Sequence, residues 1–297
     1  MRYFYMKIGN SNSLAGSWLS GENPLKRPAV VIFFGKSSVD DIRNGKSDPQ
    51  ARQFVESSLK KNREHIRIVV VGKGNCWILQ PSGNVIEYRP SLKDGHNLKD
   101  LWKILPVNIL TTLSIRDIPP VLAGINAHAY LGRGTYRELG KTNWGNIKAI
   151  HSVLGEPLPA EHLEKINCQA TNLFECLSSV ELETLVAKLF ESQGCFVPAY
   201  RGSYIQDVDL FIRNENLTSI NLNGLYVPPN SSITLQVKRR LGLRKKVGNA
   251  DHLIALDAPV LNAEWLLEQI KEIPSVSLWL KKSLSWLSPD FLSNYSL

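Results

Sequence analysis

A helical pattern in the C-terminal half constrains this chain more than any other feature. Five apolar residues recur there at the i, i+3, i+4, i+7, i+8 spacing of one helix face: Leu182, Leu185, Val186, Leu189 and Phe190. Ser178 and Glu181 have the spacing of a capping box at the helix start. Gly194 suits the helix end, because glycine accepts the left-handed backbone found there. The sequence therefore predicts an amphipathic helix between Ser178 and Gly194.

Three short runs that favour strands follow this helix, at 195–197, 208–212 and 233–238. The interval between the last two is long and polar, and we expect an inserted hairpin or loop at about 214–231. A further apolar run at 252–256 and an amphipathic helix at 263–270 come next. The C-terminal part is thus predicted to be an α/β unit with a mixed sheet.

Three polar residues in these predicted strands are candidates for a catalytic site. Asp209 sits inside the apolar run VDLFI, where a carboxylate is costly unless a cation or hydrogen bonds compensate it. Gln236 and Lys238 are two residues apart in one strand, so their side chains project from the same face. Metal-dependent hydrolysis of a phosphodiester needs oxygen ligands for a hard cation and a positive group near the phosphate. These residues supply both.

The segments ETLVAKLFESQG, DVDLFI and ITLQVK, in this order, resemble the Mrr-type branch of the restriction-endonuclease-like (PD-(D/E)XK) nucleases. The resemblance covers residues 178–238 and implies an αβββαβ core with a mixed sheet. It also implies an Mg²⁺-dependent endonuclease, with Mn²⁺ as an alternative metal, that cuts double-stranded DNA in a restriction or defence system. Many enzymes of this superfamily act as dimers, so a homodimer is part of the expectation.

The same resemblance assigns a role to each site residue. Asp209 would be the main metal ligand, and Gln236 a second ligand through its carbonyl oxygen. Lys238 would activate water or stabilise charge, and Glu183 would be the acidic helix residue that completes the site. Asp207 is either a turn residue or a further ligand, and Glu183 has the alternative role of a solvent-exposed helix residue.

The sequence departs from the family pattern in three ways. The Pro-Asp pair is absent, a glutamine stands where an acidic residue is usual, and 27 positions separate Asp209 from Gln236. The neutral Gln236 lowers the charge of the site and weakens the expected metal affinity. Two other functions therefore stay open: a catalytically inactive nucleic-acid-binding protein with this fold, and a repair or junction-resolving nuclease.

Basic residues cluster directly after the third strand. Six of the nine residues at 238–246 are Lys or Arg, and side chains of this kind position a nucleic-acid backbone without reading its sequence. A second, glycine-rich basic element lies at 132–137. The predicted nucleic-acid contacts are Arg239, Arg240, Arg244, Lys245, Lys246, Arg133 and Arg137. The alternatives are a solvated loop or a localisation signal for the first element and a tight turn for the second.

The first 155 residues predict a separate, mostly β or α+β domain, followed by a linker at 156–177 and the nuclease-like domain at 178–297. A hairpin is expected from 65–71 and 76–79, and a polar helix near 49–60. Net charge is +9 for 1–170 and −1 for 171–297, so the N-terminal part is the better candidate for binding DNA. Its tryptophans either form an aromatic pocket that stacks a base or belong to the core: Trp18, Trp77, Trp102 and Trp144.

Cysteine usage and hydropathy bear on the cellular compartment. Four cysteines are far apart and lack the C-x₂-C spacing of zinc or redox sites, so we expect them to be reduced. No stretch approaches 18 apolar residues and no signal peptide is evident, so neither export nor a membrane is expected. The prediction is an intracellular, cytoplasmic protein that acts on DNA. The cysteines are Cys76, Cys168, Cys176 and Cys195.

Overall fold

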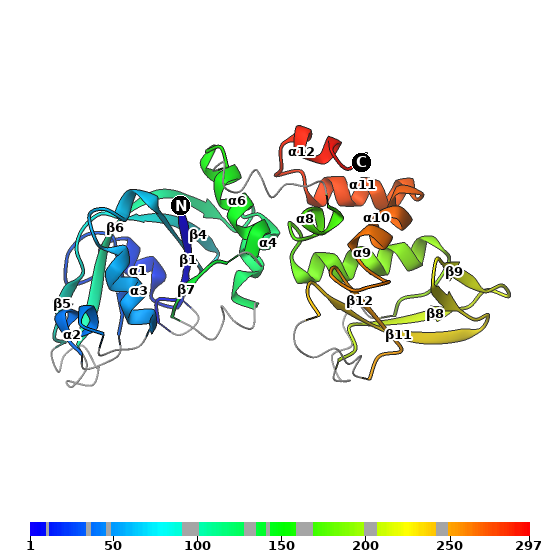
Figure 1. The fold of residues 1–297 in the computed structure, drawn as a ribbon, viewed down its shortest axis with the longest axis horizontal. Helices are drawn as coiled ribbons and strands as arrows, with labels where there is room; N and C mark the ends of the chain where they lie inside the picture. Colours follow the sequence, from blue (N-terminus) through cyan, green and yellow to red (C-terminus); the bar gives the residue numbers. More distant parts are fainter. Residues whose placement is uncertain are drawn as a thin grey trace. The chain divides into compact units, whose positions relative to one another are not determined.

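The computed structural model describes residues 1–9, 12–33, 37–45, 49–90, 101–127, 135–140, 143–158, 169–198, 207–241 and 249–297. The chain divides into two compact units, Met1–Glu156 (unit 1) and Pro157–Leu297 (unit 2) (Figure 1). Both units combine helices with mixed sheets, which agrees with an α/β class. The division lies next to the end that the sequence predicted for the N-terminal domain.

Unit 1 is built on a seven-stranded sheet. Its strands are β1 (Arg2–Met6), β2 (Ala29–Ile32), β3 (Ile66–Gly72), β4 (Asn75–Pro81), β5 (Ile86–Tyr88), β6 (Trp102–Ser114) and β7 (Tyr136–Glu138). Six follow the order β2-β6-β4-β3-β1-β7, and β5 pairs with β6. β1 and β3 run parallel, whereas the other described pairs are antiparallel. The predicted hairpin is confirmed as β3–β4.

Short helices accompany this sheet. They are α1 (Ala15–Leu19), α2 (Val39–Arg43), α3 (Pro49–Ser57), α4 (Pro120–Ala123) and α6 (Trp144–Leu154), with 3₁₀ turns η2 (Arg63–His65) and η4 (Gly124–Ala127). α3 is the polar helix expected near 49–60. Packing in this core is aromatic: the ring of Tyr136 stacks on Phe4 at 4.5 Å, and its hydroxyl donates to Ser57 Oγ at 2.9 Å.

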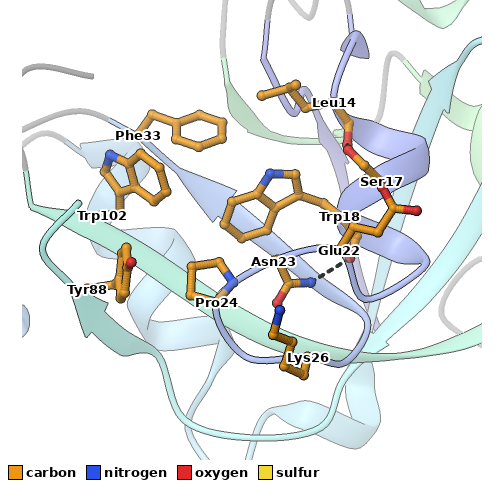
Figure 2. Close-up of a pocket in the computed structure, with 10 residues that line it drawn as sticks. All are labelled: Leu14, Ser17, Trp18, Glu22, Asn23, Pro24, Lys26, Phe33, Tyr88 and Trp102. Carbon is orange, nitrogen blue, oxygen red and sulfur yellow. Dashed lines mark hydrogen bonds between the residues drawn. The ribbon is translucent and has the colours of Figure 1, made fainter. Parts of the chain in front are cut away.

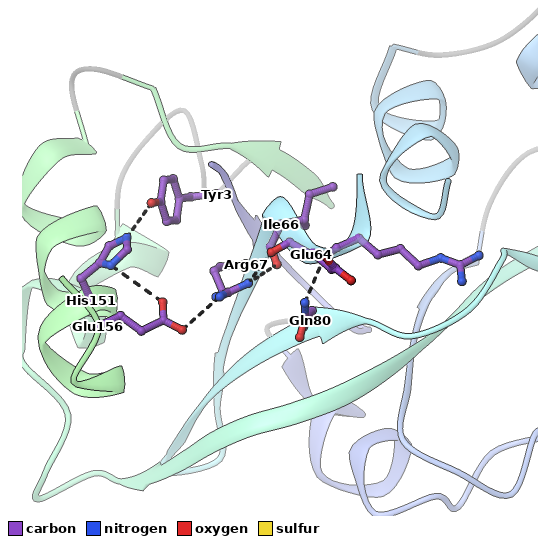
Figure 3. Close-up of polar contacts among 8 residues, drawn as sticks. Tyr3, Glu64, Ile66, Arg67, Gln80, His151 and Glu156 are labelled. Atoms are coloured by element: carbon purple, nitrogen blue, oxygen red, sulfur yellow. Dashed lines mark hydrogen bonds and ion pairs between the residues drawn. The ribbon is translucent and has the colours of Figure 1, made fainter. Parts of the chain in front are cut away.

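A buried polar network holds α6 against the strands of unit 1 (Figure 3). Tyr3 Oη of β1 and His151 Nε2 of α6 are hydrogen-bonded at 2.6 Å. Glu156 Oε1 accepts from Arg67 Nη2 of β3 at 3.0 Å, and its second oxygen lies 3.8 Å from His151 Nδ1. Arg67 and His151 are both buried. The network supplies partners for polar groups that would be costly to bury alone, and we read it as structural.

Unit 2 contains a three-stranded sheet in the order β12-β11-β8 and a separate hairpin, β9–β10. Its elements are α8 (Ala170–Phe174), α9 (Ser179–Ser192), β8 (Leu210–Asn214), β9 (Ile220–Leu222), β10 (Leu225–Val227), β11 (Ser231–Lys238), β12 (His252–Ala255), α10 (Ala263–Lys271), α11 (Pro274–Ser283) and α12 (Pro289–Ser293). β11 is antiparallel to β8 and parallel to β12. A bridge between Phe196 and Arg213 adds the segment before β8. The hairpin β9–β10 confirms the predicted insertion.

Helix α9 matches the sequence prediction closely. Ser178 Oγ accepts from Glu181 N at 3.2 Å, and Glu181 Oε2 accepts from Ser178 N at 2.8 Å, so the capping box is present. The five residues of the apolar stripe are all buried. Gly194 has φ +83° just after the helix end. α9 lies along one face of the β8–β11 sheet, where its stripe shares a core with Leu235 and Val237 (Figure 1).

The predicted linker differs from the structure in its second half. Residues 170–177 include α8, and Leu173, Phe174 and Leu177 are fully buried in the core of unit 2. This segment is therefore part of the folded unit, because its apolar side chains pack beside α9. The segment is too short to show a helical periodicity in the sequence.

Two expectations about the whole chain have a direct structural outcome. Cys76, Cys176 and Cys195 are buried thiols, as predicted, whereas Cys168 lies outside the described residues. Burial raises the pKa of Cys76 to about 12 and that of Cys195 to about 11, which makes both thiols poor nucleophiles. Among the helices that the structure describes, none combines the length and apolar character needed to cross a membrane.

Candidate functional site

Asp209 lies directly before β8 and is fixed against β11. Its backbone N donates to Leu235 O at 2.9 Å, and its Oδ2 accepts from Val237 N at 2.7 Å. The backbone pairing of β8 with β11 ends at Leu210 and Leu235, and beyond it the Asp209 carboxylate accepts the hydrogen bond of Val237 N. Burial raises the pKa of Asp209, and the charge of Asp207 adds to this, whereas the Val237 N–H and the charge of Lys238 lower it. The structure therefore holds a partly desolvated carboxylate beside a cationic side chain.

Gln236 is the most informative residue of the site. Its side chain is only 2% exposed, and its Nε2 donates to Asp207 Oδ1 at 3.2 Å. This contact identifies which end of the amide is the nitrogen. The other end, Oε1, is buried and accepts no hydrogen bond from the described residues. A buried acceptor without a partner costs about 1–3 kcal/mol, so Gln236 Oε1 is available to accept a hydrogen bond or to coordinate a cation.

Asp207 belongs to this group, although the sequence left its role open. It has φ +66°, a left-handed conformation that aspartate tolerates better than most residues, and it is exposed. The structure supports both alternatives for this residue, since it lies in a turn and also contacts Gln236. The signal in the sequence was the D-V-D spacing of Asp207 and Asp209. In the structure both aspartates contact β11.

Lys238 completes the cluster on β11. Leu235 and Val237 face the core with α9, so Gln236 and Lys238 alternate to the opposite face of the strand. Lys238 is half-buried and close enough to Asp209 to favour the ionised carboxylate. The oxygen donors here are two carboxylates and one amide, the hard ligands that Mg²⁺ and Mn²⁺ prefer. Within the described ranges, no group of three or more His, Cys, Asp or Glu side chains is arranged to hold a metal ion.

Glu183, the predicted acidic helix residue of the site, lies on α9. It is half-buried on α9, the helix that packs over the core face of the sheet. The contacts described above for Asp209, Gln236 and Lys238 involve other residues. Its role in metal binding stays a prediction.

The predicted DNA-binding arginines after β11 turn toward the protein. Arg240 Nη2 forms an ion pair with Glu175 Oε1, and Glu175 is only 3% exposed. Burial raises the pKa of Glu175, while Arg240 and then Arg239 lower it. Burial also lowers the pKa of Arg239. Both arginines therefore stabilise a buried carboxylate, and their contacts with DNA stay predictions.

The remaining basic residues have mixed outcomes. Arg137 is half-buried in β7 of unit 1, opposite Tyr5 in the ladder with β1. The other four, Arg133, Arg244, Lys245 and Lys246, lie outside the described residues.

We expect Arg240→Ala to destabilise unit 2 by about 1–2 kcal/mol. Breaking a fully buried ion pair costs about 3–5 kcal/mol, but the Arg240 side chain is 43% exposed, so solvent reduces the loss. Urea unfolding of the full chain, followed through unit 2 by amide hydrogen exchange, measures the change. The matched control is Arg213→Ala, which removes an exposed pair with Glu215 (side chains 57% and 56% exposed) and should cost little. Equal effects of the two variants would contradict a structural role for Arg240.

The described residues thus bring Asp207, Asp209, Gln236 and Lys238 together at one end of the β8–β11 pair. In comparisons with protein-family models, curated proteins and solved structures, no match to this chain was found.

Proposed function

We propose that this chain is a metal-dependent DNA endonuclease whose site lies in unit 2. The observation that carries the proposal is the buried Gln236 Oε1, which has no hydrogen-bond partner among the described residues and stands in a group with two aspartates. A divalent cation held by Asp209 and Gln236 would satisfy this oxygen and stabilise the desolvated carboxylate of Asp209. The residues present therefore fit the metal that the sequence resemblance implies.

The order of elements in unit 2 supports the same proposal. α9 is followed by the Phe196 segment, β8 and β11, and then by β12, which runs parallel to β11. A restriction-endonuclease-like αβββαβ core has a helix, three strands, a second helix and a last strand in this order. The described residues supply all of these except the second helix, which would fall between β11 and β12, where 242–248 lie outside the described residues. Asp209 precedes the second of these strands, and Gln236 and Lys238 end the third.

Each residue has a defined task in the proposed reaction. A bound Mg²⁺ ion would lower the pKa of a water molecule and offset the charge of the phosphate. Asp209 and Gln236 would hold the ion through their side-chain oxygens, and Asp207 orients the amide of Gln236. The ammonium group of Lys238 stabilises negative charge that develops on the phosphate or the attacking water. Glu183 is proposed as a further acidic ligand.

The proposed substrate is double-stranded DNA, with a use in restriction or defence inside the cell. Unit 1 holds 22 Lys and Arg against 12 Asp and Glu, and this positive charge favours a polyanion. A specific observation favours a second candidate: Gln236 is neutral, so the site has less charge than a pair of acidic ligands would supply. The second candidate is a DNA-binding protein of the same fold that does not cut.

Metal-dependent cleavage by the full chain tests the proposal. Supercoiled plasmid, with and without base modification, and a branched junction are incubated with Mg²⁺, Mn²⁺ or EDTA. We expect nicked or linear DNA with either metal, none with EDTA, and a large loss in Lys238→Met but not in Lys271→Met, which lies on α10. The preferred substrate separates restriction from junction resolution. DNA that is bound but never cut would establish the inactive binding protein instead.

The raised pKa of Asp209 gives a prediction about pH. Asp209 must be ionised to hold a cation, so protons compete with the metal at a higher pH than for an ordinary aspartate. Below the raised pKa, the apparent Mn²⁺ affinity should fall by up to about tenfold per pH unit. The same raised pKa affects the stability of the metal-free protein. Burying the charged carboxylate of Asp209 costs free energy of folding, and this cost disappears as pH falls through the raised pKa.

Calorimetric Mn²⁺ titrations between pH 8 and pH 4.5 measure this dependence. Asp207→Asn removes a negative charge that raises the pKa of Asp209, so it should move the pH profile downward. A profile that stays in place in Asp207→Asn would show that this charge does not act on the metal ligand.

A further inference from the structure

Unit 1 contains an open cavity of about 600 Å³ with an aromatic lining. Figure 2 shows Trp18, Phe33, Tyr88 and Trp102 around this cavity. Polar residues, including Glu22 and Lys26, line the remaining wall. The volume lies within the range of about 300–1,000 Å³ that is typical of ligand pockets.

Four separate elements bring these rings together. Phe33 follows β2 directly, Tyr88 is the last residue of β5 and Trp102 is the first residue of β6. Tyr88 and Trp102 are direct partners in the β5–β6 register, so their side chains lie on one face. Trp18 comes from α1. The other two tryptophans of the sequence prediction, Trp77 and Trp144, do not line this cavity. All four tryptophans are largely buried, so Trp18 and Trp102 belong to the core and present only an edge to the cavity.

The rings pack against one another edge to face or tilted and together form one aromatic wall of the cavity. The ring of Phe33 is nearly perpendicular to Trp18 (86°, centroids 5.5 Å apart) and to Trp102 (88°, 5.0 Å). Trp18 and Trp102 are tilted by 58° with centroids 6.1 Å apart. Tyr88 lies 5.6 Å from Trp102 and is partly exposed, which places it at the edge of the aromatic wall.

The loop beside the cavity is held by its own hydrogen bonds. Asn23 Nδ2 donates to Trp18 O at 2.8 Å and to Arg27 O at 2.7 Å, and Asn23 Oδ1 accepts from Leu25 N at 2.9 Å. The turn contains Lys26 with φ +54°. These bonds fix the loop that follows Trp18, so this side of the cavity does not need to be ordered when a ligand binds.

Charge decides which class of ligand fits. An aromatic cage for a quaternary ammonium group works best where negative charge surrounds it. Here Glu22 is offset by Lys26 in the lining, Arg27 is exposed in the same loop, and unit 1 as a whole is strongly basic. These charges favour a planar ring that is attached to a polyanion. Aromatic side chains bind such rings by stacking, without regard to base identity.

We propose that this pocket binds a single nucleobase turned out of a DNA duplex. The inference rests on the proposed function for its choice of DNA, and it goes further by assigning a base-recognition site to unit 1. Turning out a base costs least where the base is mismatched, damaged or otherwise weakly paired. The pocket would therefore select DNA by the state of one base.

Binding in EDTA tests the pocket without any contribution from cleavage. The full chain is titrated with two duplexes of the same sequence, one fully paired and one with a single mispaired 2-aminopurine, whose fluorescence reports stacking. We expect tighter binding of the mispaired duplex, with quenched fluorescence. Tyr88→Ala and Trp102→Leu should reduce this preference about tenfold or more, so that the mispaired duplex binds little more tightly than the paired one. Tyr226→Ala is the matched control, because this tyrosine is 53% exposed in unit 2.

The outcomes separate this proposal from the nuclease proposal. An unchanged preference in both pocket variants, or competition by choline but not by nucleosides, would overturn the base pocket whether or not the protein cuts DNA. If the preference is lost in the variants but no metal supports cleavage, the pocket stands and the nuclease fails. If no duplex binds, the protein is titrated with nucleoside monophosphates instead. Binding that is weakened in Tyr88→Ala would support the pocket, whereas no binding, or binding that Tyr88→Ala does not weaken, would refute it.

Discussion

Asp209→Asn should abolish metal-dependent cleavage while leaving unit 2 folded. The amide has the shape of the carboxylate and can still accept a hydrogen bond from Val237 N, but it lacks the charge that holds a cation. We expect a fall in cleavage rate of about 10³-fold or more, the scale seen when a group that stabilises transition-state charge is removed. The melting temperature in EDTA should be equal or higher, because burial disfavours the charged form of Asp209.

Asp251→Asn provides the matched control for this prediction. Asp251 also binds β11, since its Oδ2 accepts from Thr234 N at 2.7 Å and from Thr234 Oγ1 at 2.9 Å. It is exposed, however, and these bonds lower its pKa, so its charge stabilises the fold above its ordinary pKa. The variant should keep its cleavage activity and lose some stability at neutral pH. Similar cleavage rates in Asp209→Asn and wild type would remove Asp209 from the reaction.

Phe190→Ala should produce the largest loss of stability. Phe190 is fully buried at the end of the α9 stripe, and removing a buried phenylalanine costs about 3–5 kcal/mol through lost burial and a residual cavity. A domain is typically stable by only about 5–15 kcal/mol, so a large fraction of unit 2 should unfold under mild denaturation. Amide hydrogen exchange in urea, read separately for α9 and for β3 of unit 1, measures the effect.

Val180→Ala on the same helix is the control for this second prediction. Val180 is 45% exposed, and substitutions at such positions usually change stability by less than about 0.5 kcal/mol. Protection of β3 should not change in either variant, because unit 1 has its own core. Equal losses in Phe190→Ala and Val180→Ala would show that the apolar stripe does not stabilise unit 2.

The elements that the sequence predicted correctly are those with local signals. α9 has a complete apolar stripe and a capping box, and both come from residues within one helix. The β3–β4 hairpin and β9–β10 are likewise short-range features in which a turn joins apolar runs. Periodicity indicates that one face of an element is buried. This is sufficient to predict the element itself, whichever part of the fold that face packs against.

Several elements were missed because their stability comes from distant contacts. β6 was not predicted, although it pairs with β2, β4 and β5. α6 is held by a polar network to β1 and β3, and the second half of the predicted linker packs into the core of unit 2. None of these partners is adjacent in sequence, so no local pattern identifies them.

The residues of the candidate site also fall into those predicted from local sequence and those placed by distant contacts. The sequence predicted the chemical types of all three site residues and placed Gln236 and Lys238 on one strand, because alternation along a strand fixes which residues share a face, whereas Asp209 lies just before β8 rather than inside it. Only the tertiary structure decided that Asp207 orients Gln236, that Arg240 pairs with buried Glu175, and that Trp18 and Trp102 line a cavity while Trp77 does not. The physical reason is that hydrogen bonds, ion pairs and cavities depend on which distant atoms meet, and a one-dimensional pattern does not contain that information.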